Sequence, residues 1–400
     1  MNVKFSQLSN ALRFLSIDAV QKANSGHPGM PMGMADVATV LFKYHLRFNP
    51  KNPDWVNRDR FILSAGHGSM LLYSLLHLTG YESVSLEDIK NFRQLDSICA
   101  GHPEYKSGTG IETTTGPLGQ GLGNAVGMAI AEEILKKKFG SSLINNKTYV
   151  IASDGDLMEG ISHEAMSLAG HLKLKNLIVF FDNNKISIDG STSLSVSDNY
   201  KKRFEGYGWN FLEINGHNEK QISKAITKAS KANKPTLISC KTIIGFGSPN
   251  KSGKASSHGS PLGVEEIALV RKKLKWNNEP FQIPEDILNS WRTIGKKGIK
   301  LEEKWLETLN KKSSHIKSEL NKTYVESNLK NLEDLIKEEK VKYFDLKPSM
   351  ATRQCSSAVI ESISSILPQL IGGSADLSGS NNTKTNKSKV INSKNFDGNY

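Results

Sequence analysis

Two short apolar runs joined by a helical pattern constrain the fold of this chain more than any other feature. Residues 149–152 and 177–182 have the composition of buried strands, and a helical pattern covers residues 161–174. A strand–helix–strand connection of this length makes the two strands parallel when they share a sheet. Because helices cover both faces of such sheets, the pattern predicts an α/β protein.

The rest of the chain predicts two α/β parts with a helical connector between them. Residues 1–275 alternate strand-like runs with helical patterns, which indicates a doubly wound, mostly parallel sheet with helices on both faces. Residues 276–346 are charged and mostly helical, so we expect a connector there. Residues 347–400 read as the incomplete start of a second α/β domain, with a helix at 350–366 and a short strand at 369–373.

Asp154 and Asn184 come just after the two strands of the crossover unit. In a parallel sheet both positions lie outside the carboxyl ends of the strands, where open α/β sheets bind ligands. A carboxylate, an amide oxygen and the free backbone carbonyl of Ile186 suit Mg²⁺, which takes about six oxygen ligands. Because a diphosphate can supply two of the others, the pattern predicts a phosphate-bearing cofactor.

The net charge of +12 raises the question of a nucleic-acid partner. The excess lysine lies in diluted clusters such as 136–138 and 311–312, most of which alternate with glutamate. The interleaving of basic and aromatic residues that marks RNA-binding sheets is missing. We therefore expect no nucleic-acid partner, and a basic surface that favours anionic substrates.

Targeting and membrane patterns are missing from the sequence. It has no run of about 18 apolar residues, and residues 1–6 lack the charged-then-apolar order of a signal peptide. Cys99, Cys240 and Cys355 are far apart and outside any paired-cysteine motif, which argues against a disulfide framework or a zinc site. These features predict a cytoplasmic protein without membrane contact.

A glycine-rich turn at residues 115–121 leads into a long helical pattern. Backbone amides at a helix start form a site for anionic oxygens. The turn is no dinucleotide fingerprint, because no strand precedes it. Gly119, Gly123 and Gly127 recur every four residues, which predicts a helix face bare enough for close backbone packing.

Four of the ten histidines, at positions 27, 67, 102 and 258, stand in glycine-flanked turns. Each one alone reads more readily as a loop residue that the backbone satisfies. Four at the ends of different α/β segments instead indicate convergence on one crevice, where their rings would serve hydroxyl and phosphate oxygens. We interpret the other six as structural: His45, His77, His163, His171, His217 and His315.

Long, colinear motifs from about residue 5 to residue 400 match one known family. Besides Asp154-Gly155 and Asp182-Asn183-Asn184, they include Ser25-Gly26-His27-Pro28-Gly29, Ser64-Ala65-Gly66-His67-Gly68, Gly101-His102-Pro103-Glu104, Thr115-Gly116-Pro117-Leu118-Gly119, Ser257-His258-Gly259, Ala351-Thr352-Arg353 and Gly373-Ser374-Ala375-Asp376. On these motifs the chain resembles transketolase, a family of thiamine-diphosphate enzymes.

The resemblance implies a metal-bound thiamine diphosphate on the thiamine-diphosphate-binding fold. Asp154, Asn184 and the Ile186 carbonyl would hold Mg²⁺, for which Ca²⁺ or Mn²⁺ could substitute. The residues in contact with the cofactor would be His67, Gly116, Pro117, Leu118, Gly155, Asn184, Ile188, His258 and, from the second domain, Asp376.

The resemblance also implies the residues that handle the sugar-phosphate substrate. His27, His102 and His258 would bind hydroxyls around the reacting carbons and act in catalysis. Arg353 and Ser380 would bind the terminal phosphate, a task that suits the fixed fork of a guanidinium group. Where the family usually has Gly, this chain has Ser153, which need not disturb the metal because the ligands lie elsewhere.

The implied activity is ketol transfer in the pentose phosphate pathway. A two-carbon unit would pass from xylulose 5-phosphate to ribose 5-phosphate or erythrose 4-phosphate, with thiamine diphosphate as electron sink. The resemblance implies a homodimer with shared active sites, and it places the glutamate that activates the cofactor beyond Tyr400. We therefore expect the 1–400 chain alone to be inactive.

Two other interpretations stay open at this point. The chain could be a truncated, non-catalytic protein that binds the cofactor or a partner. It could also be a related ketose-phosphate enzyme such as dihydroxyacetone synthase or deoxyxylulose phosphate synthase. Arg353 and Ser380 favour transketolase over the first, since a mere cofactor holder needs no group to bind a sugar phosphate. The full histidine set together with Arg353 favours transketolase over the second. The Gly/Ser-rich residues 245–263 also predict a mobile lid that brings His258 to the cofactor.

Overall fold

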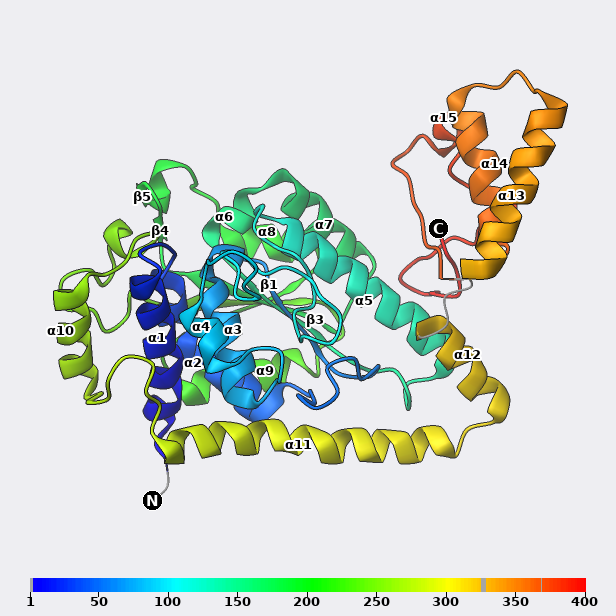
Figure 1. The fold of residues 1–400 in the computed structure, drawn as a ribbon. Coiled ribbons are helices and arrows are strands. Elements are labelled where there is room, and N and C mark those ends of the chain that lie inside the picture. Colours follow the sequence, from blue (N-terminus) through cyan, green and yellow to red (C-terminus); the bar gives the residue numbers. More distant parts are fainter. Residues whose placement is uncertain (1–2, 325–328, 368) are drawn as a thin grey trace. The chain divides into compact units, whose positions relative to one another are not determined.

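The computed structural model describes residues 3–324, 329–367 and 369–400, shown as a ribbon in Figure 1. The chain divides into two compact units. The first consists of Met1–Glu132 and Asn145–Trp305, and the second of Glu133–Ile144 and Leu306–Tyr400. The domain boundaries expected from the sequence stay predictions.

A five-stranded parallel sheet forms the centre of the first unit. Its order is β1-β2-β3-β7-β6, and every neighbouring pair is parallel. This confirms the doubly wound α/β fold. A two-stranded antiparallel sheet follows β3 in the chain. The strands are β1 (Arg60–Leu63), β2 (Thr148–Ala152), β3 (Leu177–Asn183), β4 (Ile186–Ser187), β5 (Gly190–Ser191), β6 (Asn210–Asn215) and β7 (Thr236–Lys241).

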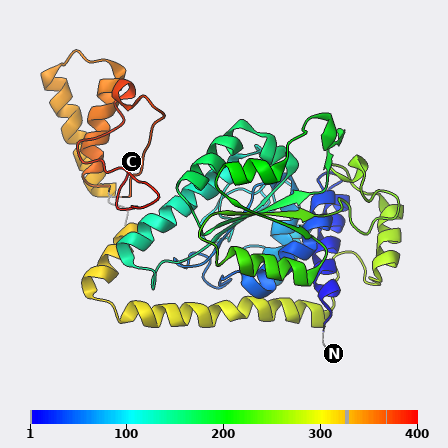
Figure 2. The same ribbon diagram turned by 180° about the vertical axis from the view of Figure 1, so that it is seen from behind.

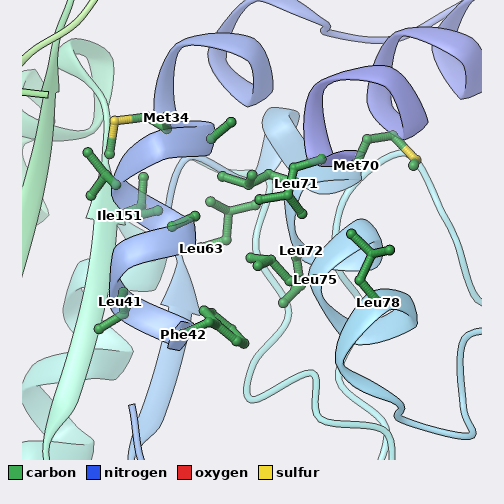
Figure 3. Close-up of a cluster of buried hydrophobic side chains, with 14 of the residues drawn as sticks. Met34, Leu41, Phe42, Leu63, Met70, Leu71, Leu72, Leu75, Leu78 and Ile151 are labelled. Carbon is green, nitrogen blue, oxygen red and sulfur yellow. The ribbon is translucent and has the colours of Figure 1, made fainter. Parts of the chain in front are cut away.

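Both faces of this sheet are buried, which explains why its central strands are apolar at consecutive positions. On one face Ile151 and Phe180 join a large core with α1 (Phe5–Lys22), α2 (Gly29–Val40) and α3 (Ser69–Thr79). Figure 3 shows part of this core, with the labelled side chains Met34, Leu41, Phe42, Leu63, Met70, Leu71, Leu72, Leu75, Leu78 and Ile151.

The opposite face lies under a second helix layer. There Phe181 of β3 contacts Tyr200 of α8 (Tyr200–Gly206), with ring centroids 4.7 Å apart. The indole of Trp209 donates a hydrogen bond of 2.8 Å to the carbonyl of Met166 in α7 (Gly160–His171). Figure 2, seen from behind, shows the sheet between its helices.

Further helices lie wholly or partly in the first unit. The helix predicted at 161–174 is α7, whose bounds are slightly earlier. Residues 264–274 and the start of the long helix after them add to the core of the α1 side. The remaining elements are η1 (Leu41–His45), η2 (Gly66–Gly68), α4 (Leu86–Lys90), α5 (Gln120–Phe139), α6 (Asp154–Met158), η3 (Thr192–Leu194), α9 (Glu219–Ala229), η4 (Ala255–Ser257), α10 (Val264–Leu274) and α11 (Glu285–Asn310).

The glycine pattern of α5 is only partly a packing face. Gly119 precedes the helix, and a Cβ atom there would lie 2.6 Å from a methyl carbon of Ile161, so the close neighbour is a side chain and not the predicted backbone. Gly127 has open space where its side chain would be, so the prediction was wrong for that position. Instead Gly121, which the pattern did not include, would meet the Cα of Ser64 at 2.6 Å.

In the second unit the described residues form helices and loops. They are α12 (Ser314–Tyr324), α13 (Leu329–Leu346), α14 (Thr352–Ser364) and α15 (Ser378–Asn381). The helix predicted at 350–366 is α14, but the strand predicted at 369–373 is wrong. Described residues of that segment are irregular, and Gly372 donates a single backbone hydrogen bond to Asn399. Two adjacent glycines weaken strand propensity, and the described residues of this unit include no strand that could pair with them.

Among the helices that the structure describes, none combines the length and apolar character needed to cross a bilayer.

Candidate functional site

The two residues predicted to hold a metal lie at the tips of adjacent strands. Strands β2 and β3 pair in parallel, with Ala152 opposite Phe181. Asp154 begins α6 two residues after β2 ends, and Asn184 comes directly after β3. The placement expected from the sequence is therefore confirmed: both residues stand at the carboxyl edge of the sheet.

Ser153 stabilises the turn between β2 and α6 and is not one of the predicted metal ligands. Its hydroxyl accepts from the backbone N–H of Asp156, and its own N–H donates to the Asp156 carboxylate at 2.9 Å. This reciprocal pair is a capping box, which satisfies amides at the start of the helix. Serine at this position is thus explained by the turn, and it leaves the Asp154 side chain outside the capping bonds.

Two buried acids at this edge, Asp154 and Asp182, form no ion pair with a basic side chain of the described residues. Burial and the charge of Asp182 raise the pKa of Asp154 to about 7, while Lys185 and Tyr200 lower it less. Burial also raises the pKa of Asp182 to about 6, although hydrogen bonds from Thr242 and Asn184 oppose the shift. Such shifts mean that negative charge is poorly compensated here, so a divalent cation would relieve it.

The amide of Asn184 is held in one orientation. Its nitrogen donates to a carboxylate oxygen of Asp182 at 2.9 Å, and its oxygen accepts from the Ile186 N–H at 2.9 Å. A flipped amide would lose both bonds, so the network fixes which atom is oxygen. A carbonyl oxygen has two lone pairs, and the second one remains for a metal. The other oxygen of Asp182 accepts from the hydroxyl of Thr242.

This donor set fits a hard cation rather than a zinc-like metal. Among the residues that the structure describes, no three His, Cys, Asp or Glu side chains are grouped to hold a metal ion. The predicted ligands are of another kind: one carboxylate, one amide oxygen and one peptide carbonyl. Oxygen-only sets of this type are what Mg²⁺ and Ca²⁺ take, with the remaining positions filled by phosphate or water.

The glycine-rich turn is tied to the same edge of the sheet. The Gly119 N–H donates to Asp156 at 2.8 Å, and the hydroxyl of Ser64 donates to the same oxygen at 2.9 Å. A methyl of Leu118 lies 2.8 Å from where a Cβ of Gly155 would be. Leu118 and Gly155, which are both predicted to contact the cofactor, are therefore neighbours.

Gly116 brings the turn to the histidines. Its φ of +144° lies outside the range that side-chain-bearing residues favour, and a Cβ there would be 3.2 Å from the ring of His102. Pro117 follows it with an exposed ring. The hydroxyl of Thr115 anchors the turn by donating to the carbonyl of Leu63, at the end of β1, at 2.9 Å.

The four histidines in glycine-flanked turns do converge. The ring centroid of His27 lies 5.2 Å from that of His67, 6.5 Å from that of His102 and 5.7 Å from that of His258. The rings of His67 and His258 stack with centroids 5.1 Å apart. The prediction of one shared crevice is confirmed, and the interpretation of each histidine as a separate loop residue is wrong.

All four rings are held neutral at physiological pH. Burial, then the charges that His258, Arg93 and His102 would carry, lower the pKa of His27 to about 4. Burial lowers the pKa of His67 to about 3, with further contributions from His258, His27 and His102. Burial likewise lowers the pKa of His102 and of His258. A neutral imidazole offers one donor and one acceptor, as sugar hydroxyls require.

Buried ring nitrogens in this cluster have no partner among the described residues. These atoms are Nδ1 of His27 and Nδ1 of His258. A buried polar atom without a hydrogen bond is costly, so it points to a partner from outside the chain. Ile188 lies close to this cluster. A Cβ atom on Gly259 would be 3.2 Å from the ring of His27 and 3.6 Å from a methyl carbon of Ile188.

Two residues at the site were missed by the sequence analysis. Arg93 adopts a left-handed backbone with φ of +61°, donates to Ser25 at 2.8 Å, and influences the pKa values of His27 and His102. Tyr200 lies beside Asp154, and its hydroxyl lowers the pKa of that carboxyl group. Neither stands in a motif, so no sequence signal identified them.

Three predicted site residues belong to the second unit. Arg353, Asp376 and Ser380 are exposed there, and their roles stay predictions. A cavity of about 730 Å³ in the first unit, lined by Tyr81 and Arg292 among others, contains none of the predicted site residues.

Comparison with known proteins identifies the family. Residues 5–329 match the family model described as "Transketolase, thiamine diphosphate binding domain". This chain belongs to the transketolase family. The resemblance expected from the sequence motifs is thereby confirmed.

Curated transketolases of bacteria match nearly all of the chain. The Rhodobacter capsulatus transketolase is 51% identical over 379 residues, which are 95% of this chain and 56% of that protein. The transketolase of Buchnera aphidicola subsp. Acyrthosiphon pisum is 53% identical over 403 residues, covering 98% of this chain and 60% of that protein. The chain thus spans less than two thirds of the transketolases that it matches.

Solved transketolase structures share the fold. The Campylobacter jejuni enzyme superposes with a TM-score of 0.89 at 43% identity, over 100% of this chain and 61% of that one. A Pichia stipitis transketolase in complex with sedoheptulose 7-phosphate has a TM-score of 0.88 at 39% identity, over 99% and 60%.

Proposed function

We propose that this chain is the cofactor-binding part of a transketolase that moves a two-carbon ketol unit between sugar phosphates. The donor would be xylulose 5-phosphate, and the acceptors ribose 5-phosphate or erythrose 4-phosphate, as in the pentose phosphate pathway. The observation that carries the proposal is one edge of one sheet, where a buried acid and a fixed amide stand with a cluster of four neutral histidines.

The metal and diphosphate would be held at the strand tips. Asp154, the oxygen of Asn184 and the carbonyl of Ile186 would bind Mg²⁺, with Ca²⁺ or Mn²⁺ as substitutes. The raised pKa of Asp154 supports this, because a cation compensates charge that the protein leaves unbalanced. Further contacts to thiamine diphosphate would come from His67, Gly116, Pro117, Leu118, Gly155, Ile188 and His258, and from Asp376 in the second unit.

When bound, thiamine diphosphate supplies the electron sink on which cleavage of the bond between sugar carbons 2 and 3 depends. The chain's own residues orient the substrate and move protons. His27, His102 and His258 would bind the hydroxyls of the reacting carbons, and the unpartnered nitrogens of His27 and His258 suit this role. Neutral rings can take up a proton from a hydroxyl and return it.

Substrate specificity would come from Arg353 and Ser380, which would bind the terminal phosphate. Solved Pichia stipitis transketolases carry sedoheptulose 7-phosphate and xylulose 5-phosphate, which supports a phosphorylated substrate for this chain. A fixed guanidinium fork pairs with phosphate oxygens more specifically than an ammonium group does.

We further propose a cytoplasmic homodimer whose subunits share each site. One subunit would give the diphosphate side described above, and its partner the residues on the pyrimidine side, including the activating glutamate of the family. The 1–400 chain alone would then bind the cofactor but turn over little or no substrate. Of the two alternative functions, a non-catalytic binding protein predicts no product and a dihydroxyacetone synthase predicts a different product, so the same experiment separates them from the proposed function.

The experiment is a turnover assay with Mg²⁺ and thiamine diphosphate, on the chain alone and with a polypeptide that supplies the rest of the family's length. With xylulose 5-phosphate and ribose 5-phosphate we expect sedoheptulose 7-phosphate only when both parts are present. Turnover by the chain alone would contradict the proposed incompleteness. If the completed protein makes no sedoheptulose 7-phosphate, or uses formaldehyde as the preferred acceptor, the transketolase proposal fails.

A further inference from the structure

Residues 242–263, which connect β7 to α10 and include His258, lie directly on the first turns of α2. The N–H of Gly245 donates to the carbonyl of Gly29 at 3.0 Å. A Cβ on Gly29 would lie 2.5 Å from the carbonyl of Ser257, and one on Gly33 would lie 2.9 Å from the carbonyl of Ile243. Only glycine permits such approach, so backbone meets backbone along this helix.

His217 is attached to the beginning of this segment. It lies between β6 and α9 and is mostly buried, with 14% of its side chain exposed. Its Nε2 accepts the backbone N–H of Ile243 at 3.1 Å, and its Nδ1 lies 2.8 Å from a carboxylate oxygen of Asp36. The ring of Phe246 stacks on the imidazole with centroids 4.1 Å apart.

These contacts determine the state of the imidazole. A backbone N–H can donate only to a ring nitrogen that carries no proton, so Nε2 is bare and the proton is on Nδ1. Nδ1–H then donates to Asp36, which must be ionised to match it. Burial alone would raise the pKa of Asp36, but the charge of Arg13 and hydrogen bonds from His217, Arg13 and Ser9 keep it below its ordinary value.

Asp36 is itself fixed by a buried arginine. The guanidinium of Arg13 pairs with it at 2.6 Å and donates to the carbonyl of Met32 at 2.9 Å. The same guanidinium lies over the ring of Phe246, 4.6 Å from its centroid. The chain of contacts Arg13–Asp36–His217–Ile243 thus joins α1 and α2 to the peptide that precedes the histidine segment.

The peptide of Ile243 is a branch point for the proposed cofactor site. On one side Thr242 donates to Asp182, which fixes the amide of Asn184. On the other side Gly245 is bonded to Gly29, two residues after His27. Movement of this one peptide would therefore disturb both the proposed metal ligand and the histidine cluster.

We propose that His217 is a positioning residue: its bare Nε2, kept so by Asp36, holds the Ile243 peptide and thereby both halves of the cofactor site. The expected effect on cofactor binding rests on the proposed function, but the contact between His217 and the Ile243 peptide does not. The sequence analysis interpreted His217 as structural only. A structural role would lower stability without separating the two ring nitrogens.

Two variants distinguish the role of Nε2 from that of Nδ1 in His217. The amide of His217→Gln can reach where Nε2 stands and accept from Ile243, whereas that of His217→Asn replaces only the Nδ1 end. His171→Asn, an exposed histidine on α7, is the matched control. The first readout is hydrogen exchange at the Ile243 amide without cofactor. We expect exchange to be about tenfold faster or more in His217→Asn and near wild type in His217→Gln.

The second readout is the calorimetric affinity for thiamine diphosphate at fixed Mg²⁺. His217→Asn should weaken binding about tenfold, and His217→Gln should restore most of it. If both variants exchange and bind like wild type, or if both are impaired equally, the positioning role is overturned. Failure of the wild-type chain to bind the cofactor would instead count against the proposed function, and the exchange measurement would still decide the role of His217.

Discussion

Acidification should destabilise the first unit through His67, by an amount that follows from its burial. Burial and the nearby rings of His258, His27 and His102 lower the pKa of His67 from 6.5 to about 3. The native ring therefore stays neutral at pH 5, while the unfolded chain takes up a proton there. A base with a lowered pKa stabilises the fold fully above 6.5, and this stability is lost as the pH falls below that value.

The magnitude follows from this linkage alone. In the unfolded chain His67 has an ordinary histidine pKa, and in the native state it stays unprotonated at pH 5. Its protonation on unfolding therefore lowers the free energy of unfolding by about 2 kcal/mol when the pH falls from 7 to 5. The result hardly depends on how far below pH 5 the native pKa lies. In His67→Asn this contribution is absent, so its stability should fall by about 2 kcal/mol less than that of wild type over the same interval.

The assay is urea unfolding followed by tryptophan fluorescence at both pH values. The five tryptophans, at positions 55, 209, 276, 291 and 305, all belong to the first unit, so the signal reports that unit. Comparing the pH-induced change removes the effect of the substitution itself. His171→Asn should respond to pH like wild type. If His67→Asn loses as much stability as wild type on acidification, the account of the neutral cluster is refuted.

Two further substitution sets test the packing around the site. Gly127→Ala should stabilise the first unit by up to about 1 kcal/mol, because the added Cβ meets open space in α5. Gly121→Ala should destabilise the unit by about 1–3 kcal/mol, because the added Cβ would meet the Ser64 backbone. Equal effects of the two substitutions in thermal unfolding would contradict this. Asp156→Asn cannot accept from both Gly119 and Ser153, so we expect a loss of about 2–3 kcal/mol and faster proteolysis near residues 116–118. Unchanged proteolysis would show that Asp156 does not hold the turn.

The sequence predicted the strand tips well because the cause is local. The apolar runs of β2 and β3, the helix between them and the right-handed crossover together determine that Asp154 and Asn184 share one edge. The convergence of the four histidines was also predictable, since each follows an α/β element. Motif matching then identified the family, which the comparisons confirm.

Contacts between distant segments were beyond the sequence. Nothing near His217 in the chain indicates that its two nitrogens serve Asp36 and Ile243, which are 181 and 26 residues away. Arg93, which follows α4, and Tyr200, which begins α8, likewise reach the site only through tertiary packing. The strand predicted at 369–373 failed for a related reason: a strand needs a pairing neighbour, and local composition does not supply one.

The most direct test of the account is a calorimetric titration with thiamine diphosphate, with Mg²⁺ and then with EDTA. We compare wild type with Asp154→Asn and with Asp345→Asn, an exposed acid on α13. Binding should require the metal, and Asp154→Asn should weaken it by about tenfold or more, while Asp345→Asn should not. Cofactor affinity that is the same in Asp154→Asn and independent of Mg²⁺ would contradict the proposed site at the strand tips.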